Sequence, residues 1–187
     1  MGCGARYGSC MTAPNPTRPP LDEDTLRVAR QVFQWVRSGD LPALQPYLGH
    51  GLPTNLRNEN GDSLLMLAAY HGHAELVKAL LRHGADPSVA NDRGQTPLAG
   101  AAFKGHAEVV RALLDHGAEV DAGGPDGRTA LMTAAMFNRV AILDLLIERG
   151  ADPSHRDASG MTALAAAEKM GAEDAADRLR ALARAGS

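Results

Sequence analysis

The sequence has few aromatic residues and few lysines. Phe, Trp and Tyr together make up 4% of the 187 residues, whereas apolar residues of all kinds make up 44%. A core built from this chain must therefore consist of thin layers of Ala, Leu and Val. Lysine occurs only as Lys78, Lys104 and Lys169, while Arg and Ala are abundant. This bias is typical of GC-rich bacterial genomes and favours a bacterial protein.

Cysteine and net charge are also low. The two cysteines, Cys3 and Cys10, both lie near the start of the chain. This placement excludes a disulfide framework in the remaining residues and favours a reducing compartment, so we expect a cytoplasmic protein. The formal net charge of −3 provides no basic surface for nucleic acid or for an anionic membrane. We therefore expect neither nucleic acid nor a membrane as a partner.

No apolar run approaches the length that is needed to span a bilayer. Gly, Pro, Ser and Thr dominate residues 1–20, and these residues contain no apolar stretch typical of a secretory signal. We expect them to form a disordered tail. Gly2 and Cys3 could carry a lipid, but Arg6 stands where the myristoylation pattern requires Ser or Thr. Met11 is an alternative start of the chain.

The dominant feature of the sequence is an internal repeat. The phrase at Gly72, GHAELVKALLRHGADPSV, returns 33 residues later at Gly105 as GHAEVVRALLDHGAEVDA. Two more glycine series keep this spacing: Gly84, Gly117 and Gly150, and then Gly61, Gly94, Gly127 and Gly160. A fixed period of this length is typical of stacked units, each too small to bury its own apolar face. The period therefore predicts one elongated domain.

Each unit predicts the order turn, helix, turn, helix. A Gly-containing turn opens each unit, and Asn60-Gly61 and Asp126-Gly127 are pairs that favour tight hairpins. A hydroxyl residue suited to cap a helix follows in each unit: Ser63, Thr96, Thr129 and Thr162. The second helix has apolar residues at i, i+1, i+4 and i+5, which form one wide face. Gly84, Gly117 and Gly150 are expected to end this helix in the left-handed conformation.

These units resemble the ankyrin repeat, whose period is about 33 residues and whose pattern includes T-P-L-H-x-A. The resemblance is clearest in the stretch GQTPLAGAAFKGHAEVVRALLDHGAEVDA and covers all of the chain except the tail. It implies an all-α repeat solenoid of stacked helix-turn-helix units with short β-hairpin loops. One departure is that Met66, Ala99, Met132 and Ala165 replace the histidine of the pattern. The hydrogen bonds that this histidine makes to the turns are therefore missing.

The ends of the chain differ from the middle. We divide it into a tail (1–20), a divergent N-capping repeat (21–57), three full repeats (58–156) and a C-capping repeat (157–185). The first helix, from about Leu21 to Arg37, is expected to bury Leu26, Phe33, Trp35 and Val36. In the last unit, core positions become charged at Glu168, Arg178 and Arg180 because no further repeat covers them. A chain that is capped at both ends is expected to be a monomer.

The sequence shows no constellation of catalytic residues. His50, His83 and His116 recur at the period, as do His73 and His106, which indicates a role in the scaffold. No nucleophile–base pair, zinc spacing or phosphate-binding loop is present. We therefore expect no enzyme, no metal and no cofactor. The alternative is an accessory stress-defence protein that binds a metal or small ligand through the repeated histidines.

The resemblance implies that hairpin tips and the solvent side of each first helix line a concave groove for a protein partner. Aromatic and Met residues recur at these positions, a composition typical of binding hot spots. The opposing interpretation is that these side chains only shield the alanine layers. We predict an adaptor, regulator or inhibitor that contacts an unidentified protein partner. The predicted contact residues are Glu59, Asn60, Asp62, Tyr70, His71, Asp92, Arg93, Gln95, Phe103, Lys104, Asp126, Arg128, Met136, Phe137, Met161, Lys169 and Met170.

Overall fold

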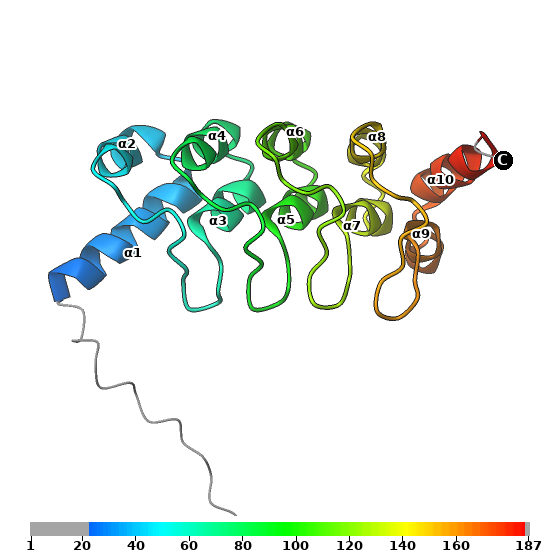
Figure 1. Cartoon of the computed structure of the whole chain (residues 1–187), viewed down its shortest axis with the longest axis horizontal. Helices are drawn as coiled ribbons and strands as arrows, with labels where there is room; N and C mark the ends of the chain where they lie inside the picture. The colour runs from blue at the N-terminus through cyan, green and yellow to red at the C-terminus, as the bar shows by residue number, and fades with distance from the viewer. Residues whose placement is uncertain (1–22, 186–187) are drawn as a thin grey trace, which may run out of the picture.

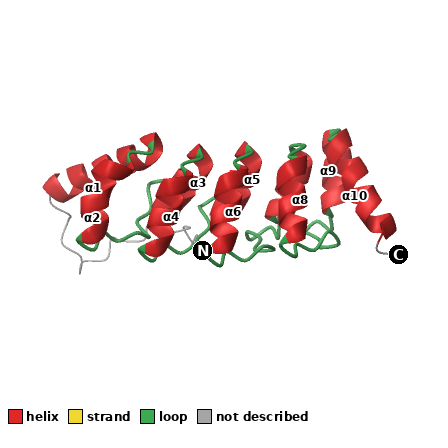
Figure 2. Cartoon of the chain, turned by 90° about the horizontal axis from the view of Figure 1, so that it is seen from above, coloured by secondary structure: helices red, strands yellow, loops and turns green. Residues whose placement is uncertain are grey.

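The computed structural model describes residues 23–185, and all the regular elements in this range are helices. The helices form successive pairs that stack side by side into an elongated solenoid (Figures 1 and 2). This arrangement confirms the predicted all-α repeat solenoid. The predicted tail and Leu21, at the start of the first helix, lie outside the described residues. The helices are α1 (Glu23–Ser38), α2 (Leu41–Gly49), α3 (Leu64–His71), α4 (Ala74–Arg82), α5 (Pro97–Lys104), α6 (Ala107–Asp115), α7 (Ala130–Met136), α8 (Val140–Glu148), α9 (Ala163–Met170) and α10 (Glu173–Ala185).

Two rows of helices and one row of loops make up the solenoid (Figure 1). The inner row contains α3, α5, α7 and α9, and the outer row contains α2, α4, α6 and α8. The loops that lead from an outer helix to the next inner helix project away from the outer row, and we call them fingers. Fingers 1 to 4 are residues 50–63, 83–96, 116–129 and 149–162. This arrangement places the fingers beside the inner helices.

The helix caps form as the sequence predicts. The hydroxyl oxygens of Ser63, Thr96 and Thr129 accept hydrogen bonds from backbone N–H groups three residues later, at 3.0, 3.2 and 3.3 Å. Thr162 makes the same bond at 3.3 Å. Each bond satisfies a donor that the first helical turn leaves without a partner. Every inner helix therefore begins at a defined residue of the repeat.

The core consists of small and medium apolar residues. Alanines such as Ala68, Ala101 and Ala134 are fully buried in the inner helices, and their small side chains allow these helices to approach one another closely. Leucines of the outer helices, including Leu80 and Leu113, are also fully buried. The predicted burial of Leu26 is wrong, since this residue is 40% exposed. Along α1, Val36 is buried as predicted, Phe33 and Trp35 are half-buried, and Val32 is buried in addition.

The fingers contain little regular β pairing. In the described residues, one isolated antiparallel bridge joins Arg57 and Ser63. Side chains hold the turns in place: the Asn91 side-chain oxygen accepts from the N–H groups of Arg93 and Gln95, at 3.1 and 3.0 Å. Asp157 makes the same kind of contact to the backbone of Ser159 and Met161 in finger 4. These bonds order the turns, although the tetrapeptide histidine is absent.

Candidate partner-binding surface

A row of aromatic rings runs along the inner helices. The rings of Tyr70 and Phe103 are stacked with centroids 6.2 Å apart, and those of Phe103 and Phe137 meet edge to face at 4.5 Å. Tyr70 and Phe103 are half-buried, and Phe137 is 38% exposed. The rings come from the C-terminal ends of α3, α5 and α7, and we call them the aromatic row. The predicted side chains therefore form one continuous apolar strip.

Charged and titratable groups flank the Tyr70 end of the aromatic row. The Lys104 ammonium lies 5.0 Å from the centre of the Tyr70 ring, within the range of a cation–π contact. The His71 ring meets the Tyr70 ring edge-on and stacks on the His73 ring at 6.1 Å. Partial burial, assisted by the nearby His73, lowers the pKa of His71 below its ordinary value of 6.5. This end of the row thus combines a fixed cation with an imidazole that stays neutral at neutral pH.

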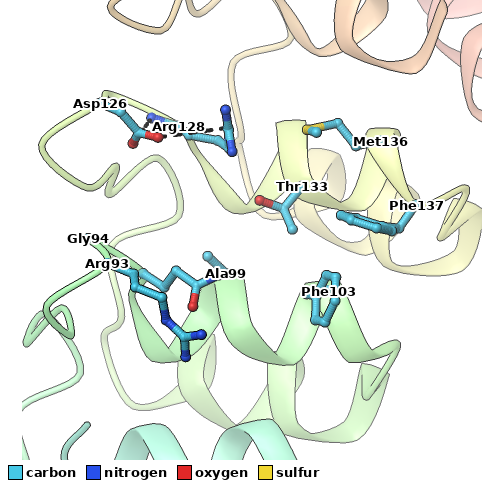
Figure 3. A pocket seen from close by; sticks show the side chains of 10 residues that line it. Arg93, Gly94, Ala99, Phe103, Asp126, Arg128, Thr133, Met136 and Phe137 are labelled. Carbon is cyan, nitrogen blue, oxygen red and sulfur yellow. Dashed lines mark hydrogen bonds and ion pairs between the residues drawn. The ribbon is translucent and has the colours of Figure 1, made fainter. Parts of the chain in front are cut away.

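A pocket opens where the aromatic row meets fingers 2 and 3. It has a volume of about 200 Å³ and is lined from both fingers and from α5 and α7 (Figure 3). Phe103 and Phe137 face each other at one end, and Arg93, Asp126 and Arg128 lie on the fingers at the other (Figure 3). The remaining residues that line it are Gly94, Gln95, Ala99, Thr133 and Met136. Seven of the predicted contact residues are therefore brought together around one hollow.

The other predicted contact residues lie outside this pocket. Lys169 and Met170 are exposed on α9, and Met170 is 51% exposed. Glu59 lies on finger 1 beside α1, and with Phe33 it lines a different hollow. Asn60 is also exposed on finger 1, Asp92 on finger 2, and Met161 is half-buried on finger 4. The predicted set thus extends over the whole length of the inner side.

Asp62 differs from the other predicted contact residues because it is buried, with 6% of its surface exposed. Its carboxylate accepts hydrogen bonds from the side-chain amides of Asn58 and Asn91, at 3.2 and 2.8 Å. The bond to Asn91 joins finger 1 to finger 2. The geometry therefore places Asp62 between the fingers rather than at their surface.

Two carboxylates at the finger tips, those of Asp92 and Asp126, lie beside basic side chains. Asp92 pairs with Arg57 at 3.5 Å, and Asp126 lies 3.9 Å from the guanidinium of Arg128. Arg57 also donates a hydrogen bond to the carbonyl oxygen of Ala90, which links fingers 1 and 2. By contrast, no carboxylate of residues 23–185 pairs with the Arg93 side chain, which is exposed. Arg93 is thus a cation with free donors at the mouth of the pocket.

With this geometry defined, the comparisons identify the family. A family model for three consecutive ankyrin repeats matches residues 32–123 and 120–184. The chain belongs to the ankyrin-repeat family. The ankyrin repeat is a non-enzymatic module that generally mediates protein–protein interaction, and its stacked units present extended binding surfaces.

A curated relative carries the same repeat. The chain is 52% identical over 61 residues to the ankyrin repeat protein PA3287 of Pseudomonas aeruginosa. The matched segment spans 33% of this chain and 36% of that protein. The likeness therefore concerns about two ankyrin units, and it carries no further information on partners.

Three pocket residues, Gly94, Ala99 and Thr133, are missing from the sequence-based prediction. Ala99 stands one full period from Met66 and from Met132, and Thr133 stands one period from Gly100. These differences in side-chain size between the ankyrin units are visible in the sequence. They were informative only once the structure showed that Ala99 and Thr133 line the same space.

The recurring histidines contact the backbone of the ankyrin units. The Nδ1 atoms of His50, His83 and His116 lie 2.7 to 2.8 Å from the carbonyl oxygen four residues earlier, at the ends of outer helices. His73, which follows α3, contacts α1: its Nε2 atom lies 2.9 Å from the carbonyl oxygen of Arg37. Within residues 23–185, no group of three or more His, Cys, Asp or Glu side chains is arranged to hold a metal ion. No helix of this range is long and apolar enough to cross a bilayer.

Proposed function

We propose that this protein acts as an adaptor or as a regulator of another protein by binding it at the finger face. We define the finger face as the fingers together with the exposed positions of the inner helices. The partner contacts the aromatic row and the finger tips, and the protein itself performs no catalysis. The repeat family supports a protein as the ligand, because ankyrin repeats generally mediate protein–protein interaction.

The observation that carries this proposal is the partial exposure of the aromatic row. Aromatic residues make up 4% of the sequence, yet the three aromatic residues of units two to four meet in one strip of the surface. Aromatic and Met side chains are enriched at the centres of protein interfaces because they bury a large area at a small entropic cost. Met136 borders the strip on α7, which extends the apolar area.

The competing explanation is that the rings only shield the alanine layers beneath them. Part of each ring is buried, and an edge-to-face pair contributes about 0.5–1.5 kcal/mol beyond its buried area. Removal of the rings is therefore expected to lower stability to some extent, whatever their function. A test must separate this loss from a loss of binding.

The test compares which partner proteins the purified full chain captures with those that its variants capture. Phe103→Ser/Phe137→Ser removes the two rings that lie in contact, and Leu114→Ser removes a half-buried apolar side chain from the outer helix of the same unit. Thermal melting of each variant shows how much stability the change costs. We expect the double variant to lose the protein captured by the parent chain, and Leu114→Ser to retain it.

Two results would contradict the proposal. If both variants capture the same protein as the parent, the binding surface lies elsewhere. If both lose it in proportion to their loss of stability, the aromatic row serves only the fold.

The proposal includes a cytoplasmic monomer. The cysteine usage supports a reducing compartment, since Cys3 and Cys10 are the only two cysteines in the sequence. The exposed charges of the last unit support a monomer, because Arg180 pairs with Glu168 at 2.6 Å on a surface that a further unit would have to cover. Analytical ultracentrifugation at several concentrations tests the oligomeric state, and a dimer at low micromolar concentration would contradict it.

A further inference from the structure

The pocket between α5 and α7 exists because of side-chain sizes at two repeated positions. Between α3 and α5, the Met66 side chain reaches the next inner helix: a Cβ added to Gly100 would lie 2.9 Å from its terminal methyl carbon. One period later the equivalent residues are Ala99 and Thr133, and both line the pocket. Ala99 has no chain to extend across the gap as Met66 does. The space that Met66 reaches into between α3 and α5 is therefore left open between α5 and α7.

The inner end of the pocket is apolar. Phe103 and Phe137 stand at 89° to each other with centroids 4.5 Å apart, and Met136 lies beside them. The whole pocket has a volume of about 200 Å³, and a cavity of about 150 Å³ binds benzene in another protein. The pocket as a whole therefore has room for one aromatic or large aliphatic side chain.

The outer end of the pocket is cationic. It contains two guanidinium groups, Arg93 and Arg128, and one carboxylate, Asp126. The Asp126 carboxylate is 3.9 Å from the Arg128 guanidinium and accepts a hydrogen bond from the backbone N–H of Arg128 at 3.1 Å, so its charge is already compensated. The nearest other acid on finger 2, Asp92, is paired with Arg57. Arg93 is left as the one group of the pocket whose charge no described residue balances.

We propose that this pocket receives a short segment of the partner in which a large apolar side chain stands beside an Asp or Glu. The apolar side chain packs against the Phe103 and Phe137 rings, and the carboxylate meets the Arg93 guanidinium. Guanidinium groups bind carboxylates with two parallel hydrogen bonds, which supplies direction as well as charge. This inference rests on the function proposed above and adds the chemistry of the partner.

Other segments suit the pocket less well. A basic segment would bring like charges together at Arg93 and Arg128, which is unfavourable. A purely apolar segment would cover Arg93 without replacing the hydrogen bonds that its guanidinium makes to water. An acidic and apolar segment satisfies both ends of the pocket.

The test uses random peptides displayed on phage and selected against the full-length protein. Enriched peptides are then synthesised, and their affinity is measured by fluorescence anisotropy. We expect the enriched sequences to share an acidic residue close to an aromatic or large aliphatic residue.

Two pocket variants, each with a matched control, decide where these peptides bind. Ala99→Met fills the pocket with the residue that the neighbouring units carry as Met66 and Met132, and Ala165→Met makes the same change at an exposed position of the last unit. Arg93→Glu reverses the free cation, and Arg111→Glu makes the same change on the outer helix α6. We expect Ala99→Met and Arg93→Glu each to weaken binding by about tenfold or more. The two controls should bind like the parent.

A charge exchange provides an independent check. A peptide whose acidic residue is replaced by Lys should bind poorly to the parent and regain affinity for Arg93→Glu. This check holds even if Ala99→Met perturbs the fold, because the Arg93 side chain makes no hydrogen bond or ion pair within the described residues.

The outcomes separate this inference from the proposed function. Selection of no binder, of binders without an acidic residue, or of binders indifferent to Ala99→Met and Arg93→Glu overturns the pocket assignment. If Phe137→Ser still abolishes the binding of such peptides, the finger face binds partners through other chemistry and the proposed function stands. If Phe137→Ser leaves their affinity unchanged as well, the proposed function is also contradicted.

Discussion

Gly39 offers a sharp test of how the first two helix pairs stack. It has a φ of +74°, and a Cβ added to it would lie 2.7 Å from Cε1 and 2.9 Å from Cγ of His73 in the next unit. The His73 ring is held in place, because its Nε2 atom donates a hydrogen bond to the carbonyl oxygen of Arg37 at 2.9 Å. Gly51 has a similar φ of +82°, but nothing lies within 4 Å of its added Cβ. Gly51→Ala is therefore a matched control for Gly39→Ala.

The two substitutions differ in expected cost. The left-handed conformation costs an alanine about 1–2 kcal/mol, of which about 0.4–1 kcal/mol is offset by the lower entropy of the unfolded chain. We therefore expect Gly51→Ala to lower the free energy of unfolding by about 1 kcal/mol. Gly39→Ala has the same backbone cost and must also displace the His73 ring. Overpacking of this kind costs about 1–3 kcal/mol more.

Urea denaturation followed by circular dichroism measures both losses, and His73→Ala completes a double-mutant cycle. In Gly39→Ala/His73→Ala the ring is gone, so the combined loss should be smaller than the sum of the two single losses by about 1 kcal/mol or more. Equal losses for Gly39→Ala and Gly51→Ala, together with an additive double variant, would refute the stacking of His73 on Gly39.

Three further predictions concern the scaffold. Leu113→Ala removes a fully buried side chain from the middle of the stack and should lower the free energy of unfolding by about 2–5 kcal/mol; an unchanged melting curve would contradict the described packing. Gly117→Val places a β-branched residue at a φ of +85° and should clearly lower the melting temperature, whereas a parent-like value would mean that this φ is not required. The lowered pKa of His71 means that protonation favours the unfolded chain, so its contribution is present above about pH 6.5 and is lost as the pH falls below the folded pKa. Between pH 7.5 and 5, roughly the range in which histidine titrates, the unfolding midpoint should therefore fall less in His71→Gln than in the parent. An identical fall in both proteins would show that His71 does not contribute to this pH dependence.

Local features of the fold could be predicted from the sequence because each depends on a few neighbouring residues. Thr96 caps α5 through a contact three residues away, and the left-handed φ of Gly117 follows from its place after a helix. The burial of α1 was harder to predict. Its apolar residues allow more than one buried face, and the packing of α1 against α2 and α3 leaves Val32 buried and Leu26 exposed. The division into capping and full repeats stays a prediction.

The candidate site was predictable in outline only. The repeat period places Tyr70, Phe103 and Phe137 at similar positions, so a row of rings could be expected before the structure was known. The pocket could not, because it depends on how far the side chain at one position reaches toward the next unit. The burial of Asp62 could not be predicted from the sequence either. It depends on a hydrogen bond from the side-chain amide of Asn91, which lies in the next finger.

The central claim is that a protein partner binds the finger face. Amide hydrogen exchange of the full chain, with and without the captured partner, tests it most directly because it reports every segment in one measurement. We predict slower exchange in fingers 2 and 3 and at the C-terminal ends of α5 and α7, with α4, α6 and α8 unchanged. Slower exchange confined to the outer helices, with fingers 2 and 3 unaffected, would contradict the claim.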